Sequence, residues 1–190
     1  MSNNLAFQGD RREELIGGKV VLMSPSPAWN HISIAGSIYN IFFNYLKGKK
    51  CRPIPDGFDL HLTEDDVFIP DMMVVCDREK IKKDGVYGAP DLVVEVLSPS
   101  TAKNDKWLKK NAYEANGVPE YWIVDPVGRS IEVYLLMDGH YVLSNIYFFH
   151  TPVELAEMTD AERSTLEVEF KCHLYDDLII RLEDIFGDMI

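Results

Sequence analysis

The segment Asp91–Leu97 (DLVVEVL) constrains this 190-residue chain more than any other. Aliphatic and β-branched residues occupy both faces of the strand that it predicts, which is typical of a strand buried in the middle of a sheet. Glu95 lies within that apolar run, where a carboxylate is costly to bury unless it is paired or binds a metal ion. The sequence therefore predicts a central strand that carries a buried carboxylate, with a partner from elsewhere in the chain.

The segments around this strand predict a mixed α/β or α+β domain, in which helices pack on one sheet. Apolar residues at helical spacing predict a helix over Ala28–Leu46. The Ser98–Thr101 segment is a helix-start signal, and Gly117 is typical of the residue that follows a helix. Further strands are predicted over Lys19–Met23, Asp71–Cys76, Glu120–Asp125, Ser130–Met137 and Tyr141–Tyr147.

The length of the chain suits one domain spanning residues 1–190, with residues 151–190 as a C-terminal extension on the same core. No apolar run approaches the about 18 residues of a membrane-spanning helix, and the N-terminus lacks the layout of a signal peptide. Cys51, Cys76 and Cys172 are far apart and odd in number, so we expect three reduced, mostly buried thiols. These features favour a cytoplasmic protein without a membrane partner.

The charge of the chain limits how it could bind nucleic acid. It carries 31 acidic and 19 basic residues, for a formal net charge of −12. Broad nucleic-acid-binding surfaces are usually basic, so any contact with DNA must depend on a local basic patch. The alternative for each basic cluster is solvated surface. The clusters are Lys47, Lys49, Lys50 and Arg52, then Lys103, Lys106, Lys109 and Lys110, with Lys80, Lys82 and Lys83 as a further run in a loop.

Strand pairing predicts a partner for Glu95. We place Cys76 opposite Pro90 in an antiparallel pair of the strands on either side of the intervening loop. In that register Asp71 lies opposite Glu95, with Cβ atoms about 5 Å apart. Two carboxylates that close in a buried sheet need a cation between them, and oxygen ligands select Mg²⁺ or Mn²⁺. Such a site is suited to phosphodiester hydrolysis. The alternative is that Asp71 is a turn residue after Pro70 and that Glu95 pairs with a lysine.

Three strings around these residues are similar to one known family. They are IPDMMVVCD, APDLVVEVLSPST and KNDKWLKKNAYEANGVPEYWIVDP. Together they resemble the Uma-type restriction endonucleases, a branch of the PD-(D/E)xK nuclease superfamily, and the opening EELIGGKVVLMSPSP agrees. The match covers roughly residues 12–136. The resemblance implies a restriction-endonuclease-like fold, a mixed sheet flanked by helices, with a hairpin that carries the metal ligands.

The resemblance also implies roles for individual residues. Asp71 matches the aspartate of the PD motif, and Glu95 matches the acidic residue of the (D/E)xK motif. Both would hold Mg²⁺ (or Mn²⁺), with the backbone carbonyl of Val96 as a further metal ligand. Glu14 matches an early helix glutamate that some superfamily members use near the metal. Leu97 stands where the superfamily has its lysine, so that charge comes from elsewhere or the protein is inactive.

Lys109 is the candidate for the missing lysine. The helix after Ser98–Thr101 begins where the Glu95 strand ends, so its first turns pass over the site, and residue 109 lies about 12 Å along it. Asp105, Lys109 and Tyr113 share one helical face, a D-x-x-x-K-x-x-x-Y spacing that also occurs in the resembling family. The alternative is a solvent-exposed lysine that pairs with Asp105.

The other residues of interest are expected to have structural rather than catalytic roles. Leu108, Ala112 and Ala115 mark the sheet-facing side of the same helix, and Lys109 borders that stripe. His31, on the first predicted helix, is expected to be a hydrogen-bonded structural histidine. Three aromatic residues are expected in the core or an interface rather than in base stacking: Trp107, Tyr121 and Trp122.

The combined features favour a metal-dependent endonuclease that hydrolyses DNA, with Asp71, Glu95 and Lys109 as catalytic residues. The alternatives are a catalytically silent nuclease-fold module that binds nucleic acid or a protein partner, and a structural homo-oligomer whose acidic cleft holds cations. A homodimer is expected, since cutting both strands of a duplex commonly uses two sites related by a twofold axis. The apolar residues of Val168–Ile190 would form part of its interface or else a cover on the sheet.

Overall fold

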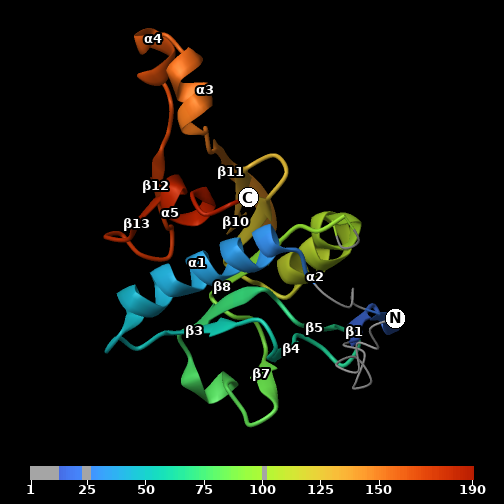
Figure 1. Ribbon diagram of the computed structural model, residues 1–190. Coiled ribbons are helices and arrows are strands. Elements are labelled where there is room, and N and C mark those ends of the chain that lie inside the picture. Colours follow the sequence, from blue (N-terminus) through green and yellow to red (C-terminus); the bar gives the residue numbers. More distant parts are fainter. Residues whose placement is uncertain (1–12, 23–26, 100–101) are drawn as a thin grey trace, which may run out of the picture.

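A six-stranded sheet organises the molecule, with a layer on each of its faces (Figure 1). The computed structural model describes residues 13–22, 27–99 and 102–190. Strands β8 and β9 run parallel, and the other neighbouring pairs are antiparallel. This mixed sheet flanked by helices belongs to the fold class that the sequence predicted. Its order is β11 (His140–Phe148), β10 (Ser130–Met137), β9 (Glu120–Asp125), β8 (Leu92–Val96), β6 (Met72–Val75) and β3 (Arg52–Pro55).

Strand β8 is the central strand that the apolar run predicted. All five of its residues are buried, and it pairs with β6 on one side and β9 on the other. Alternate residues belong to two cores: Val94 and Val96 pack in the first, and Val93 and Leu97 pack in the second. Glu95 shares its face with Val93, so its carboxylate points toward the second core.

The first core lies between the sheet and helix α1 (Trp29–Leu46). The buried residues of α1 recur at helical spacing, which explains why the helix lies flat on the sheet. The chain after residue 168 covers the rest of this face, so of the two alternatives for the C-terminal segment the structure shows the cover. No helix among the described residues is long and apolar enough to cross a membrane. The C-terminal elements are β12 (Glu169–Lys171), β13 (Ile179–Arg181) and α5 (Leu182–Phe186).

The second core lies on the opposite face, between the six-stranded sheet, helix α2 (Lys110–Ala115) and a smaller five-stranded sheet. A π-helical turn, η3 (Asn104–Lys109), leads directly into α2, and Gly117 at φ 78° follows the helix as predicted. The η3–α2 segment therefore begins close to the end of β8, where Glu95 lies. The smaller sheet has the order β2 (Lys19–Leu22), β1 (Glu13–Ile16), β5 (Val67–Phe68), β4 (Asp59–His61) and β7 (Gly85–Tyr87).

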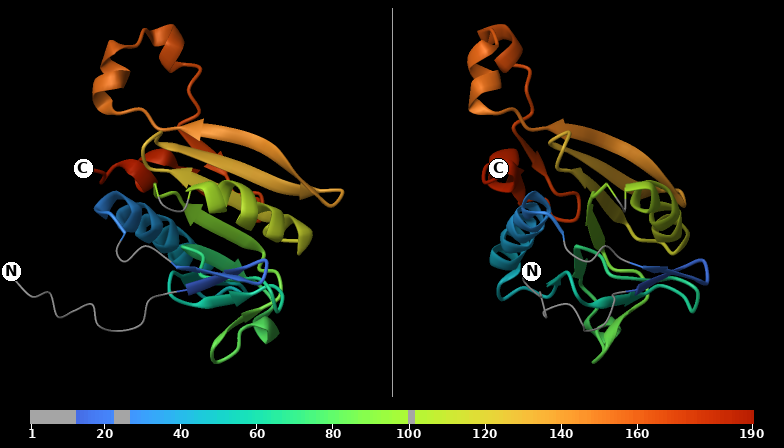
Figure 2. Two further views of the ribbon diagram at one scale, coloured as in Figure 1. Left: turned by 90° about the vertical axis from the view of Figure 1, so that its right-hand side faces the viewer. Right: turned by 45° about the vertical axis from the view of Figure 1, so that its right-hand side comes forward.

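An arm projects from the body between β11 and β12 (Figure 2). It holds two short helices, α3 (Pro152–Glu157) and α4 (Asp160–Arg163), and neither contains a buried residue. Each helix begins with a capping box, in which Thr151 or Thr159 exchanges hydrogen bonds with the glutamate three residues later. Local capping rather than burial therefore stabilises these helices.

The expectation of three reduced thiols is wrong, because Cys51 and Cys76 form a disulfide. Strands β3 and β6 pair with Arg52 opposite Val75, and one step further along this register sets the two cysteines side by side. Residues 25 apart in sequence thus become direct neighbours across the sheet. Cys172 remains a buried free thiol, as expected.

Candidate functional site

The register between β6 and β8 sets Asp71 beside Glu95. Met72 pairs with Val94 in this antiparallel ladder, and the same register continued by one residue sets Asp71 opposite Glu95. This is the register that the sequence predicted. The Val96 backbone N–H donates a hydrogen bond to Asp71 Oδ2 at 2.7 Å, which holds the aspartate at the end of β8. The two strands therefore bring both predicted metal-binding carboxylates to one place.

Glu95 is deeply buried, with 3% of its surface exposed. Its Oε1 accepts hydrogen bonds from Tyr113 Oη at 2.7 Å and from Lys109 Nζ at 3.2 Å. Burial raises the pKa of Glu95 well above its ordinary value; the Lys109 charge opposes this shift, and the charges of Asp105 and Asp71 add to it. The carboxylate thus lies in a low-dielectric site where a nearby positive charge has a large effect.

Lys109 is the positive charge at the centre of this cluster. Its Nζ lies 2.8 Å from Glu14 Oε1, 3.2 Å from Glu95 Oε1 and 3.4 Å from Asp105 Oδ1, and only 2% of the residue is exposed. Burial favours the neutral amine, but the charges of these three carboxylates outweigh it and raise the pKa of Lys109. An ammonium has three N–H donors, so each can be directed to one carboxylate. The alternative of a solvent-exposed lysine is excluded.

The helix that carries Lys109 turns a polar face to the sheet. Asp105, Lys109 and Tyr113 are its buried residues, all on the face that the spacing predicted to be shared. The expected apolar stripe is wrong, because Leu108 is 42% exposed and Ala115 is exposed. The ion pairs between Lys109 and the buried carboxylates stabilise the helix in this rotation. Leu108 is left on its exposed side.

The structure places two of the three aromatic residues in the core and leaves Trp107 on the surface. Tyr121 and Trp122 are fully buried, but Trp107 is 66% exposed, because it lies on the outer side of the same helix. Neighbouring lysines also point outward: Lys110 lies over the Tyr134 ring at 3.7 Å, and Lys106 pairs with Glu132 at 2.9 Å. Lys109 is therefore the one lysine of this cluster that contacts Glu95 within the described chain.

Glu14 enters the cluster from a strand rather than from a helix. It lies on β1 and is 4% exposed, and its Oε1 accepts hydrogen bonds from Lys109 and, at 2.9 Å, from the Ile69 backbone N–H. The resemblance suggested a helical position for this glutamate, which the structure corrects. The distance from Lys109 nevertheless places Glu14 among the groups that determine the charge at Glu95.

His31 was expected to be a hydrogen-bonded structural histidine, and the structure shows its hydrogen-bond partner, Asp71. Its Nε2 lies 3.3 Å from Asp71 Oδ2. Burial lowers the pKa of His31, but the hydrogen bond and charge of Asp71, the charge of Asp56 and a hydrogen bond to the Val96 backbone together raise it above its ordinary value. The sequence held no signal for this contact, since it depends on how α1 docks.

The oxygen donors beside Glu95 that are open to a divalent cation are few. Within the described residues, Asp71 Oδ1 and Glu95 Oε2 receive no hydrogen bond, although both side chains are largely buried. Carboxylate and carbonyl oxygens are the ligands that Mg²⁺ and Mn²⁺ prefer. In the described part of the chain, no group of three or more His, Cys, Asp or Glu side chains is arranged to hold a metal ion, so the fit depends on the two carboxylates with the Val96 carbonyl. Four carboxylates, Glu14, Asp71, Glu95 and Asp105, gather around one buried lysine, Lys109.

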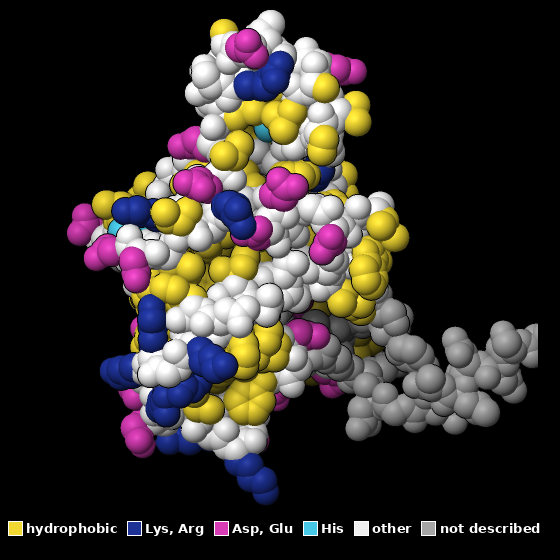
Figure 3. Space-filling model, turned by 60° about the vertical axis from the view of Figure 1, so that its left-hand side comes forward, with side chains coloured by type: hydrophobic (Ala, Val, Ile, Leu, Met, Phe, Trp, Pro, Cys, Tyr) yellow, Lys and Arg dark blue, Asp and Glu magenta, His cyan; other side chains and the backbone are white. Residues whose placement is uncertain are grey.

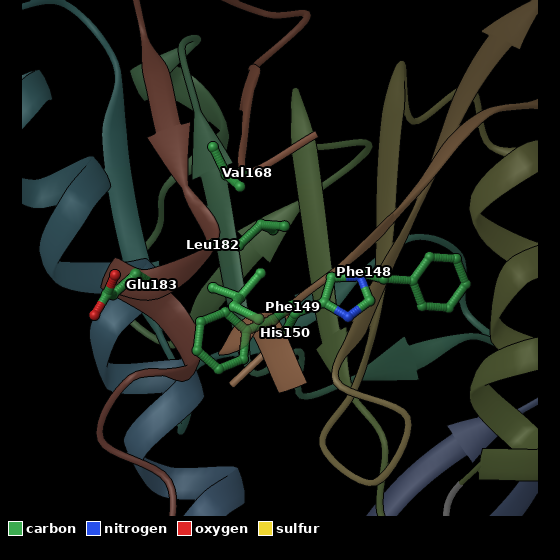
Figure 4. A pocket seen from close by; sticks show the side chains of 7 residues that line it. Phe148, Phe149, His150, Val168, Leu182 and Glu183 are labelled. Carbon is green, nitrogen blue, oxygen red and sulfur yellow. The ribbon is translucent and has the colours of Figure 1, made fainter. Parts of the chain in front are cut away.

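The cavity in Figure 4 lies away from these residues. Residues from the end of β11, from the base of the arm and from α5 surround it, and most of them are apolar. It contains none of the predicted site residues, so it is not the candidate site. Its lining residues are Phe148, Phe149, His150, Leu155, Val168, Leu182 and Glu183.

The architecture is that of a nuclease-like fold. The structure is similar to the crystal structure of a putative nuclease belonging to DUF820 from Anabaena variabilis ATCC 29413, with a TM-score of 0.63 and 18% sequence identity, over 92% of this chain and 89% of that one. At this level of identity the likeness concerns the fold.

Sequence comparison then identifies the family. The family model Uma2, described as "putative restriction endonuclease", matches residues 3–169, and the chain belongs to this family. An uncharacterised protein of Synechocystis sp. (strain ATCC 27184 / PCC 6803 / Kazusa) is 28% identical over 137 residues, which cover 70% of this chain and 72% of that protein. The family resemblance read from the sequence is thereby confirmed.

Proposed function

We propose that this protein is a metal-dependent endonuclease that hydrolyses phosphodiester bonds of DNA. The observation that carries the proposal is the contact of Lys109 with Glu95, at 3.2 Å, beside Asp71. Leu97 occupies the usual lysine position of the motif, and a lysine from the following helix reaches the same carboxylate instead. This contact supports the proposal, because it supplies a lysine charge at the motif carboxylate from a different position in the chain.

Asp71, Glu95 and the Val96 carbonyl are the groups that would hold Mg²⁺ or Mn²⁺. The ion would activate a water for attack on phosphorus and stabilise the departing oxygen. The Val96 N–H fixes the orientation of Asp71, and the Tyr113 hydroxyl together with Lys109 fixes Oε1 of Glu95. These bonds hold the two carboxylates in place before the substrate arrives, which reduces the reorganisation that the reaction requires.

The role of Lys109 is to compensate charge in this site. With all its N–H groups near carboxylates, it lowers the cost of keeping Glu95 ionised, and it can orient a water or phosphate oxygen only by giving up one of these contacts. Lys109→Met is expected to abolish cleavage, while Lys110→Met retains it because Lys110 lies over Tyr134. Equal activity of the two variants would contradict this assignment.

Replacement of Asp71 tests the proposal most directly. Asp71→Asn should abolish Mg²⁺- or Mn²⁺-dependent cleavage of plasmid DNA and leave the fold intact. Asp91→Asn is a matched control, because Asp91 Oδ2 accepts a backbone N–H from Cys76 at 2.7 Å in the same strand pair but lies at the opposite end of β8. Cleavage that survives in Asp71→Asn, or is lost equally in both variants, would overturn the proposal.

A local basic patch supports DNA as the substrate. Lys and Arg side chains gather on one part of the face shown in Figure 3. The guanidinium of Arg78 donates to the carbonyls of Lys49 and Lys50, which ties η2 (Arg78–Lys80) to the turn after α1 and brings three basic residues together. Contacts of lysine and arginine side chains with phosphates would make DNA binding salt-dependent. Lys49→Glu with Lys50→Glu should weaken DNA binding and reduce its salt dependence, as measured by fluorescence anisotropy at several salt concentrations.

One observation favours a second candidate function. Because Leu97 has replaced the motif lysine and Lys109 is saturated by carboxylates, the protein could be a silent module that binds nucleic acid without cutting it. In that case Asp71→Asn would leave DNA affinity unchanged and no cleavage would be measurable in the wild type. Cleavage by the wild-type protein that is lost in Asp71→Asn would show that the protein is an enzyme rather than a silent module.

We further propose that the protein is a homodimer located in the cytoplasm. The C-terminal segment is used to cover the sheet, so a dimer would need another surface, and the arm of α3 and α4 is the part of the described chain that projects furthest (Figure 2). Sedimentation at micromolar concentration is expected to give twice the monomer mass of 21.7 kDa. A single species at the monomer mass would contradict the dimer.

A further inference from the structure

The Cys51–Cys76 disulfide lies at the edge of the six-stranded sheet. It joins the start of β3, the last strand of that sheet, to the end of β6. Cys51 is 9% exposed and Cys76 is half-buried, whereas Cys172 is 1% exposed, so small oxidants and thiols reach the pair more readily. In the cytoplasm, the location proposed above, thiol pools reduce most disulfides, and a pair that forms there is usually catalytic or redox-sensing.

Basic residues surround the disulfide. Lys50 and Arg52 flank Cys51 in sequence, and the Arg52 guanidinium donates to the Cys51 carbonyl at 2.8 Å. Arg78 follows Cys76 by two residues, and its guanidinium donates to the Lys50 carbonyl at 3.0 Å. Cationic surroundings together with partial exposure are the conditions under which a reduced cysteine reacts as a thiolate. The same conditions, with a second cysteine next to the first, are typical of redox-sensing pairs.

A hydroxyl group lies beside the sulfur of Cys76. Tyr175 Oη is 3.8 Å from Cys76 Sγ, and burial raises the pKa of Tyr175, so the hydroxyl remains a neutral donor. Once the disulfide is reduced, this hydroxyl can donate to a thiolate at Cys76. The Cys76 backbone N–H also donates to Asp91 Oδ2 at 2.7 Å, which holds the residue in place without the disulfide. Cys76 is therefore better placed than Cys51 to react first.

We propose that Cys51 and Cys76 are a redox-active pair that hydroperoxides oxidise and dithiols reduce, and that their disulfide orders the basic patch for DNA. In the oxidation, the Cys76 thiolate attacks a peroxide oxygen, the O–O bond breaks, and the other oxygen leaves with the electron pair of that bond. The Cys51 thiol then attacks the resulting sulfenic sulfur, and the hydroxyl leaves as water with the thiol proton. A dithiol reverses the reaction by exchange and is itself oxidised to a disulfide.

The disulfide joins the two segments that form the basic patch. Cys51 directly follows Lys49 and Lys50, and Cys76 precedes Arg78 by two residues. Without the disulfide, the segments are joined by the β3–β6 ladder and by hydrogen bonds from Arg78, which can open. A covalent link reduces the freedom that the patch loses on binding and so raises affinity. This part of the inference rests on the proposed function, because it concerns the same DNA.

Mass spectrometry of the full chain tests the chemistry without DNA. Reduced wild-type protein treated with hydrogen peroxide should form the disulfide and keep one thiol that can be alkylated, that of Cys172. In Cys51→Ser the sulfenic acid of Cys76 has no resolving partner, so dimedone should trap it, and in Cys76→Ser it should trap much less. Cys172→Ser is a matched control that should form the disulfide as the wild type does. Thiols that all persist under peroxide, or equal trapping in the two variants, would overturn the proposed reaction.

Fluorescence anisotropy with duplex DNA tests the effect on the basic patch. The oxidised wild type should bind about three to ten times more tightly than the same protein reduced by dithiothreitol. This comparison needs no variant, so it decides even if a cysteine variant does not fold. The double variant Cys51→Ser/Cys76→Ser should keep the affinity of the reduced protein under both conditions.

The two ways in which this measurement can fail are distinguishable. Equal affinity of the oxidised and reduced wild type would overturn the redox control and leave the proposed function standing. Absence of DNA binding in both forms would overturn the effect on the patch together with the proposed function.

Discussion

Two buried glutamates on neighbouring strands show two ways in which this molecule stabilises a carboxylate. Glu95 on β8 and Glu120 on β9 are 3% and 1% exposed, and their strands are adjacent and parallel. Glu95 faces the second core, while Glu120 is bonded to Trp122, a residue of the first core. The two carboxylates thus lie in one sheet with similar burial but opposite surroundings.

Glu120 is held by neutral donors. Its Oε1 accepts from Trp122 Nε1 at 2.8 Å, and the backbone N–H groups of His173 and Leu174 donate to its two oxygens at 3.3 and 2.9 Å. Burial raises its pKa, and these hydrogen bonds oppose the shift. All these donors come from the protein's own sheet and C-terminal segment, so the role of Glu120 is to fasten the cover after residue 172 onto β9.

Glu95 is held by one neutral donor, the Tyr113 hydroxyl, and by one charged donor, Lys109, and more negative charge surrounds it than Lys109 can compensate. Lys109 is shared by three carboxylates, and Asp71 lies next to them. Glu120 is balanced by its own hydrogen-bond donors, whereas Lys109 does not balance the negative charge around Glu95. The comparison teaches that burial alone does not distinguish the two glutamates; the balance of charge around each of them does.

The largest effect is expected at the shared cation. Lys109→Met leaves the buried carboxylates without their counter-charge, and removing one partner of a buried pair costs about 3–5 kcal/mol of unfolding free energy. Urea denaturation followed by circular dichroism measures this loss, with Lys110→Met as the control. Adding Glu95→Gln to Lys109→Met should restore part of the stability, because it removes one uncompensated charge.

A loss below about 1 kcal/mol in Lys109→Met would contradict this account, because it would show that the carboxylates are not held ionised around Lys109.

A smaller loss of stability is expected at Glu120. Glu120→Leu leaves the indole N–H of Trp122 and two backbone N–H groups without their acceptor, at a cost of about 1–3 kcal/mol for each buried group that stays unsatisfied. Hydrogen exchange should show that the segment around His173 opens first. Metal affinity should stay at the wild-type value; if it falls, the separation of the two glutamates is wrong.

Glu95→Gln should have the opposite effects to Glu120→Leu, with little change in stability and a loss of metal binding. The amide keeps an acceptor for Tyr113 and Lys109, so unfolding free energy should change by about 1 kcal/mol or less. Calorimetric Mn²⁺ binding should be lost, since an amide oxygen is a poorer ligand than a carboxylate oxygen. A variant that binds Mn²⁺ as well as the wild type would remove Glu95 from the metal site.

The smallest effect on stability is expected at Glu154, a carboxylate on the arm that can be compared with the two buried glutamates. The Thr151 backbone N–H, together with Arg129 and the Thr151 hydroxyl, holds the pKa of Glu154 at about 2. A carboxylate with a lowered pKa stabilises the folded state above its unfolded pKa of about 4.5, and this contribution is lost as the pH falls toward 2.

Hydrogen exchange across residues 152–157 should therefore accelerate between pH 4.5 and pH 2, relative to the intrinsic rate, while β8 stays protected. Glu154→Gln should show fast exchange in the arm already at neutral pH. Equal exchange of variant and wild type at neutral pH would mean that the capping box does not stabilise α3.

Much of the candidate site follows from local rules. Side chains alternate along a strand, so a charge inside an apolar run has a definite face, and one residue of register decides which residue lies opposite. These rules predict Asp71 beside Glu95, as the pairing of Met72 with Val94 shows. The start of the next helix at the end of β8 likewise places Lys109 within reach of Glu95, and the structure shows their contact.

The sequence by itself thus determined the central strand, the register of the two carboxylates and the helix that carries the lysine. Tertiary structure alone decided the rotation of that helix, the exposure of Trp107, the Cys51–Cys76 disulfide and the contact of His31 with Asp71. The reason is physical. Periodicity in the sequence determines which residues share a face within one helix or strand. Contacts between elements depend on the balance between burial of apolar surface and attraction between charges when the layers pack together.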